Sequence, residues 1–151
     1  MLIRKANIRD VPQVRVLITE FFERVLNNSD ITYDPFCATA LAEGIIKDHF
    51  MLVIEEEKRI VGGLGGLIEP LQMNRRIKVF QEVFFYVKPT FRGYTHRLIG
   101  ELEAACKYQG IDLIVMAHLS DKNHEKMDRF YFTRGYKLLE KHYYRRIDYG
   151  R

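Results

Sequence analysis

The sequence is poor in cysteine and in long apolar runs, and each shortage excludes a class of protein. Its two cysteines, Cys37 and Cys106, lack CxxC spacing and cannot build a disulfide framework, so we expect reduced thiols in a cytoplasmic protein. The longest apolar run, Ile60–Ile68, has nine residues, four of them glycine. A membrane-spanning helix takes roughly 20 apolar residues, so no membrane partner is expected. The first ten residues carry charges and no apolar core, and we therefore expect no signal peptide.

The composition is typical of a folded globular protein. The chain has 151 residues, of which 47% are hydrophobic and 29% charged. These values exclude a disordered or collagen-like chain, and the length suits one core. With no repeat and no Gly/Ser/Pro-rich linker in view, we predict a single domain over residues 1–151. The net charge of +4 favours anionic partners such as phosphorylated cofactors or nucleic acid, without choosing between them.

Apolar residues at three- and four-residue steps predict four helices. The first covers about residues 10–25 and the second starts at residue 34. The third and fourth cover about residues 94–108 and 123–134. Asp10 is predicted to cap the first helix and Asp34 the second, and Gly110 and Gly135 should end the last two. The inward residues expected in the second helix are Ala38, Leu41 and Ile45.

Shorter apolar stretches between these helices predict a sheet. Besides a first strand from Leu2, the expected strands are Met51–Glu55 and Ile60–Ile68 as a hairpin, Lys78–Val87, a short buried Leu113–Ala117, and one or two final strands in Tyr136–Leu139 and His142–Ile147. Pro70 should stop the second strand and leave a loop over Glu69–Arg76. A strand near the C-terminus with an exposed edge would allow a homodimer.

The Lys78–Val87 strand is apolar on both faces and is therefore predicted to be central. One face should carry Val79, Val83, Phe85 and Val87, and the other Phe80, Phe84 and Tyr86. Glu82 falls among the second set, where burial would make its carboxylate hold a proton more tightly. A buried carboxylate of this kind is either a general base or a structural partner of Arg or Lys, and the sequence leaves both open.

Several common sites are excluded by spacing. The Gly-rich run Val61–Leu67 lacks the GK[ST] ending of a phosphate loop and lies within a strand pattern, so its glycines predict a bulge or a close backbone approach. The five histidines show no zinc-ligand spacing, and we expect no metal. Neither of the two serines, Ser29 and Ser120, lies in a GxSxG elbow.

Two segments carry more specific signals. In Tyr86–Ile99 a central strand ends at Val87, and a short turn with Arg92 and Gly93 opens into a helix, an arrangement that binds anions through helix N–H groups. In Phe130–Tyr136, Tyr131 lies on a helix four residues before Gly135.

Together and in this order, LIRKANIRDVPQV, IVGGL, EVFFYVKPTFRG and FYFTRGY resemble the GNAT superfamily of N-acetyltransferases over nearly the whole chain. The resemblance implies an α/β fold of the GNAT acyl-CoA N-acyltransferase type, a mixed central sheet flanked by about four helices. It also implies an enzyme that transfers an acetyl group directly from acetyl-CoA to an amine of a small molecule, peptide or protein. The pattern around QEVFFYVKP also resembles the small GNAT proteins often encoded by phages.

The resemblance also implies roles for individual residues. The strand before the turn would splay from its neighbour and pair its backbone with pantetheine at Phe85, Tyr86 and Val87. The turn and helix start would hold the pyrophosphate, with the implied contacts Arg92, Gly93, Tyr94, Thr95, His96 and Arg97. The family pattern [QR]xxGx[GA] is altered here, because Thr90 and Thr95 replace its first residue and its last small residue. Asn123 or His124 would hold cofactor or substrate at the end of the next strand.

Catalysis by such an enzyme calls for a base to neutralise the amine and an acid to protonate the departing thiolate. By family position Tyr131 is the acid, because a phenol is protonated at neutral pH and can donate. Glu82 is the candidate base. Two alternatives remain at this point: a non-catalytic GNAT-fold binding module, and a nucleic-acid-binding protein that uses the basic, tyrosine-containing tail. Of these three functions, nucleic-acid binding is the one least expected.

Overall fold

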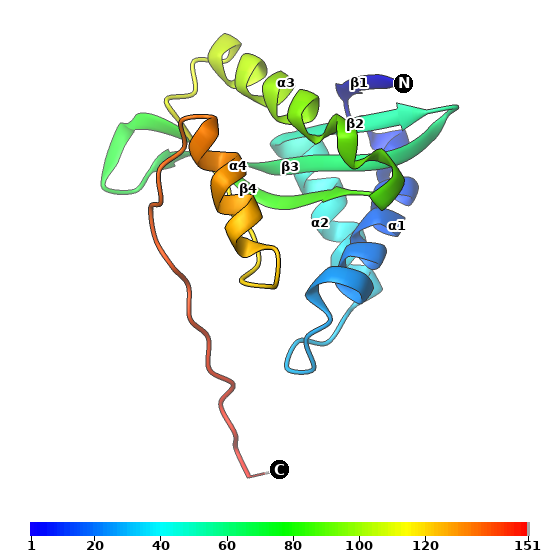
Figure 1. The fold of residues 1–151 in the computed structure, drawn as a ribbon. Helices are drawn as coiled ribbons and strands as arrows, with labels where there is room; N and C mark the ends of the chain where they lie inside the picture. The colour runs from blue at the N-terminus through cyan, green and yellow to red at the C-terminus, as the bar shows by residue number, and fades with distance from the viewer. Residues whose placement is uncertain (151) are drawn as a thin grey trace. The chain divides into compact units, whose positions relative to one another are not determined.

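A computed structural model describes residues 1–150 of the chain (Figure 1). The described residues fall into two compact units. Residues 1–27 and 33–116 make up the first unit, and residues 28–32 with those from 117 on make up the second. No helix among these residues is both long and apolar enough to span a bilayer.

The first unit contains most of the secondary structure. Its elements are β1 (Leu2–Lys5), the 3₁₀ turn η1 (Ile8–Asp10), α1 (Val11–Phe21), the π-helical turn η2 (Phe22–Leu26), α2 (Pro35–Asp48), β2 (Phe50–Glu56), β3 (Arg59–Leu71), β4 (Asn74–Val87), the 3₁₀ helix η3 (Pro89–Tyr94), α3 (Thr95–Tyr108) and β5 (Leu113–Val115). The second unit contains α4 (His124–Thr133).

The sheet has five strands in the order β1-β2-β3-β4-β5. The first four are antiparallel neighbours, whereas β4 and β5 run parallel and are connected through α3. Parallel neighbours require such a crossover. The helices α1 and α2 share one core with the sheet, and α3 lies across the sheet from them (Figure 1). The predicted α/β class, a mixed sheet with about four helices, is confirmed.

Local signals placed several helix ends correctly. Asp34 caps α2 as predicted, because its Oδ1 accepts hydrogen bonds from the N–H groups of Phe36 and Cys37 at 2.8 and 3.3 Å. Gly110 ends α3 with φ +66°, and the N–H of Ile111 donates to the carbonyl of Cys106 at 2.9 Å. This pairing is the Schellman closure that favours glycine.

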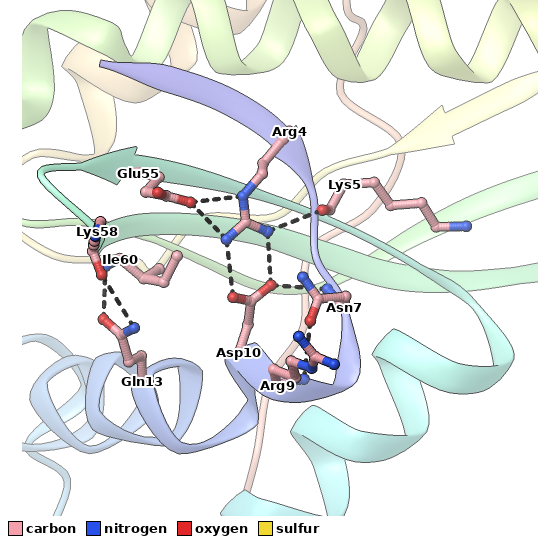
Figure 2. Close-up of polar contacts among 9 residues, drawn as sticks. All are labelled: Arg4, Lys5, Asn7, Arg9, Asp10, Gln13, Glu55, Lys58 and Ile60. Carbon is pink, nitrogen blue, oxygen red and sulfur yellow. Dashed lines mark hydrogen bonds and ion pairs between the residues drawn. The ribbon is translucent and has the colours of Figure 1, made fainter.

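Other predictions about α1 and α2 are wrong. Asp10 makes no side-chain cap on α1; its carboxylate is only 6% exposed and pairs with the Arg4 guanidinium (Figure 2). The same carboxylate also accepts from the N–H of Asn7 at 2.8 Å. Leu41 is 37% exposed, and Ala42 takes the inward position on α2.

The β2–β3 hairpin turns at Glu57 and Lys58, whose φ angles are +48° and +65°. Positive φ at both central residues matches the twist of paired strands. The predicted loop over Glu69–Arg76 is wrong, because β3 runs on to Leu71 and β4 already begins at Asn74. Pro70 remains within the strand at a register irregularity, where a missing N–H is tolerated.

The predicted end of the sheet is also wrong. Residues 136–150 contain no helix or strand, so the reason given for a homodimer does not hold. Four of the apolar residues of this tail come in two doublets, Leu138-Leu139 and Tyr143-Tyr144, and the two members of a doublet would face opposite sides of a strand. All four are more than 60% exposed. β5 is likewise shorter than predicted, and its Leu113 is 46% exposed.

Candidate active site

The second half of β4 has one paired edge and one open edge. Its pairing with β3 continues to the residue pair Gly62–Val87. Its pairing with β5, in contrast, ends at Gln81–Val115. From Val83 to Val87 no strand within residues 1–150 pairs with the β5-facing edge. Backbone groups on this edge are therefore available to an extended ligand, as at other exposed sheet edges. Phe85, Tyr86 and Val87, the residues named from the sequence, lie on this stretch.

A β-bulge interrupts β4 beside the start of this open edge. Gly65 pairs with Phe84, but the next residue, Gly66, pairs with Glu82, so Val83 is the extra residue. A Cβ atom on Gly66 would collide with the carbonyl oxygen of Gln81 and lie 2.8 Å from Cζ of Phe80. The close backbone approach predicted for the Gly-rich run is thus confirmed at Gly66.

The bulge changes which side chains share a face of β4. Phe84 and Tyr86 pack against Phe21 of α1, with ring centroids 5.9 and 6.2 Å away. Phe80 instead packs against Phe50, at 6.4 Å. The strict alternation predicted for the strand is therefore wrong, because the extra residue inverts the side-chain order.

Glu82 precedes the extra residue Val83. It is only partly buried, so its predicted burial beside Phe84 and Tyr86 is wrong. Glu82 is therefore partly open to solvent.

A charged group that sequence reasoning missed lies near the C-terminal end of β4. Lys88 Nζ forms an ion pair with Glu20 of α1 at 3.0 Å. The neighbouring Tyr86 is 5% exposed, and its pKa is raised, first by burial and then by the negative charge of Glu20. The positive charges of Arg24 and Arg92 act in the opposite direction and lower the pKa of Tyr86. No local spacing reveals this group, because its residues come from four segments.

The residues predicted to bind an anion lie in η3 and at the start of α3. Tyr94 precedes α3 without a side-chain cap, and the N–H of Thr95 donates to the carbonyl of Arg92 in η3. Five of the sequence-named residues are on its surface and one is half-buried: Arg92, Gly93, Tyr94, His96 and Arg97, with Thr95 partly covered. A Cβ on Gly93 would meet no atom within 4 Å, and its φ is not positive, so the fold itself does not require glycine there.

The second unit holds the other two sequence-named residues. Tyr131 of α4 is 7% exposed, and its ring lies against those of His118 and Tyr136, at 6.2 and 5.3 Å between centroids. Asn123 is exposed at the start of α4, and its N–H donates to Oδ1 of Asp121 at 2.8 Å. Sequence reasoning missed His118 and Asp128, which lie ten residues apart and are 2.9 Å apart from Nε2 to Oδ1.

Metal-ligating side chains do not gather anywhere in residues 1–150 in groups of three or more. The first unit thus offers an open strand edge, two arginines by the start of α3 and a partly buried carboxylate, a set that suits an extended anionic ligand. The second unit, by itself, offers a buried phenol.

Comparison with known proteins agrees with this chemistry. The sequence profile of the acetyltransferase (GNAT) family matches residues 12–136. No curated protein sequence matches significantly. The fold is similar to that of a ribosomal-protein-alanine N-acetyltransferase from Brucella melitensis biovar Abortus 2308, with a TM-score of 0.70 and 16% identity over 97% of this chain and 100% of the other.

Two further solved structures have the same fold. An aminoglycoside acetyltransferase from an uncultured soil metagenomic sample superposes with a TM-score of 0.72 and 18% identity, over 97% of this chain and 96% of the other. An aminoglycoside N-acetyltransferase in complex with CoA superposes with a TM-score of 0.68 and 17% identity, over 97% of this chain and 93% of the other.

The family match extends over well more than half of the sequence and includes β4, η3, α3 and α4. The chain therefore belongs to the GNAT family of acetyltransferases and is an N-acetyltransferase. The acyl donor of this family is acetyl-CoA.

Proposed function

We propose that this chain transfers an acetyl group from acetyl-CoA to an amine of a small molecule, peptide or protein, as one domain built from both units in the cytoplasm. The observation that carries the proposal is the open edge of β4 from Val83 to Val87, which is followed by η3 and then by the start of α3. The family profile covers parts of both units, in support of a single domain.

The residues present fit an extended, phosphorylated thioester. We infer that backbone groups of Phe85 and Val87 supply donors and acceptors for the pantetheine amides, whereas the backbone groups of Tyr86 face β3, because the Lys88 N–H bond to the Val61 carbonyl fixes this alternation. The start of α3 and the guanidinium groups of Arg92 and Arg97 supply positive charge for the phosphates. The open space at Gly93 lets a phosphate approach the backbone, which compensates for the altered loop pattern.

When bound, acetyl-CoA supplies an activated acetyl group and a thiolate leaving group. Glu82 takes a proton from the acceptor ammonium, directly or through water, so that the nitrogen lone pair attacks as the new carbon–nitrogen bond forms. The nitrogen then loses its second proton to solvent to become the neutral amide. Tyr131 donates its phenolic proton to sulfur as the carbon–sulfur bond breaks, and the resulting phenolate regains a proton from solvent. The partial exposure of Glu82 supports the base role, because a fully enclosed carboxylate would not reach a substrate.

Calorimetric titration with acetyl-CoA, with free CoA in parallel, tests donor binding. Substituting both Arg92 and Arg97 by alanine should weaken binding by roughly tenfold or more, because each charge-assisted phosphate contact contributes about 1.5–3 kcal/mol. The matched control removes the same charge from Arg75 and Arg76, which lie at the opposite end of β4 and should leave binding unchanged. No binding by the unaltered protein at millimolar acetyl-CoA would contradict the proposal.

A panel of amines then tests the acceptor class. Spermidine, kanamycin, an alanine-initiated peptide and a lysine-containing peptide are incubated with acetyl-CoA, and free thiol release is followed. Transfer to at least one primary amine is expected, and mass spectrometry should show an added acetyl group. Donor binding without transfer to any amine in the panel would favour a binding module over an enzyme.

A further inference from the structure

His118 and Asp128 form a hydrogen-bonded pair that the reaction described above does not use. His118 Nε2 is 2.9 Å from Oδ1 of Asp128, and its Nδ1 is 3.1 Å from the carbonyl oxygen of Leu119. The histidine lies three residues past the end of β5, whereas the aspartate lies in the middle of α4. The side chain of His118 is 23% exposed. Each ring nitrogen therefore lies at hydrogen-bond distance from an oxygen atom, and the imidazole has a fixed orientation.

The fixed imidazole contacts the proposed acid. The rings of His118 and Tyr131 are stacked, with an interplanar angle of 21° and 6.2 Å between centroids. Tyr136 contacts the same phenol ring at 5.3 Å, and its N–H donates to the Tyr131 carbonyl at 3.1 Å. Asp128 precedes Tyr131 by three residues, which places both on adjacent turns of α4. The dyad thus connects the segment after β5 to α4 at the phenol.

We propose that His118 and Asp128 are positioning residues for Tyr131, an inference that rests on the acid role given to Tyr131 above. A tyrosine has two side-chain torsions, of which the first decides where its hydroxyl oxygen lies, and a neighbour stacked on the ring face blocks rotation about that torsion. A misplacement of about 1 Å in a catalytic group lowers a rate by about a hundredfold. His118 supplies the blocking surface, and Asp128 holds His118 in place.

Two substitutions remove the dyad with little change in size. His118→Gln removes the stacked ring, and Asp128→Asn removes the charge that holds it. Each should lower kcat by roughly ten- to a hundredfold while KM for acetyl-CoA stays within about twofold, because the phenol is misplaced and the donor site is untouched. Glu125→Gln is the matched control: it lies one turn earlier on α4, borders the same surface groove as Asp128, and should change neither constant.

A double-mutant cycle decides whether the dyad acts through Tyr131 or only supports the fold. His118→Gln and Asp128→Asn are also made in a Tyr131→Phe background. There each should lower kcat by less than about twofold relative to Tyr131→Phe alone. If each substitution lowers kcat as much in the Tyr131→Phe background as in the unaltered protein, the inference is overturned. It is also overturned if neither substitution lowers kcat in the unaltered protein. If Tyr131→Phe alone costs nothing, the acid assignment has failed, and the inference falls with it while donor binding still supports the enzyme.

A second readout needs no donor or acceptor. In protein labelled with ¹³C-tyrosine, the Tyr131 ring signal is identified by its disappearance in Tyr131→Phe. His118→Gln and Asp128→Asn should both shift this signal, and Glu125→Gln should leave it in place. An unmoved Tyr131 signal in both dyad variants would overturn the inference, because a phenol that keeps its surroundings has not lost its positioning groups.

Discussion

The guanidinium of Arg4 and the carboxylate of Asp10 form a two-point ion pair, with Nη1–Oδ2 at 2.7 Å and Nη2–Oδ1 at 2.9 Å (Figure 2). Arg4 Nε also donates to Glu55 of β2 at 2.7 Å, so one side chain connects β1, β2 and the turn before α1. Bidentate pairs of this kind are stronger than ordinary surface pairs. The pKa of Asp10 is lowered, chiefly by its hydrogen bonds with Arg4.

This lowered pKa predicts how stability depends on pH. Because the folded-state pKa is below the unfolded value of about 3.9, the pair contributes stability above that value and loses it as the pH falls through the folded pKa. Asp10→Asn should reduce the free energy of unfolding by about 2–3 kcal/mol at pH 7, since it removes the two-point ion pair and leaves Glu55 as the remaining charged partner of a partly buried Arg4. Urea unfolding of both proteins at pH 7, 5 and 3 measures the difference, which should shrink at pH 3.

The bulge in β4 predicts a strict requirement for glycine at position 66. Gly66→Ala should lower the free energy of unfolding by about 3 kcal/mol or more, because the new Cβ collides with a backbone carbonyl that cannot move without breaking the ladder. Gly44→Ala is the control within α2, where a Cβ meets no atom within 4 Å. It should raise stability by about 0.5–1 kcal/mol. Equal effects of the two substitutions would contradict a close backbone approach at the bulge.

The acid role of Tyr131 predicts a selective loss of turnover. Tyr131→Phe should lower kcat by roughly a hundredfold and leave the Kd for acetyl-CoA unchanged, because only the proton donor is removed. Tyr108→Phe removes a phenol hydroxyl from a 93% exposed position and should have no effect. Steady-state kinetics and calorimetric titration give the two constants. Unchanged turnover would remove Tyr131 from the mechanism.

The base role of Glu82 predicts a loss that depends on pH. Glu82→Gln should slow the reaction most at low pH, where the acceptor is an ammonium ion, and the rate should recover at high pH, where the amine is already neutral. Profiles of kcat/KM against pH for both proteins show the difference. Glu101→Gln, on the exposed surface of α3, should follow the unaltered profile. A constant deficit across the pH range would indicate a structural carboxylate.

Short-range signals in the sequence were sufficient for much of the fold. The cap at Asp34, the closure at Gly110 and the strand–turn–helix after Val87 depend on groups within a few residues of one another. The motifs that resemble the GNAT family are local in the same sense, and their order along the chain predicted the fold class. The position of Phe85–Val87 at a strand end followed from this order.

Only the tertiary structure decided the features that depend on distant partners. The extra residue Val83 exists because β3 fixes the register of β4, and nothing within the strand itself shows it. Asp10 pairs with Arg4, which in turn pairs with Glu55 from a strand 51 residues away, rather than capping its own helix. An ion pair and a strand register are set by whichever groups the fold brings together, so neither follows from the neighbouring sequence.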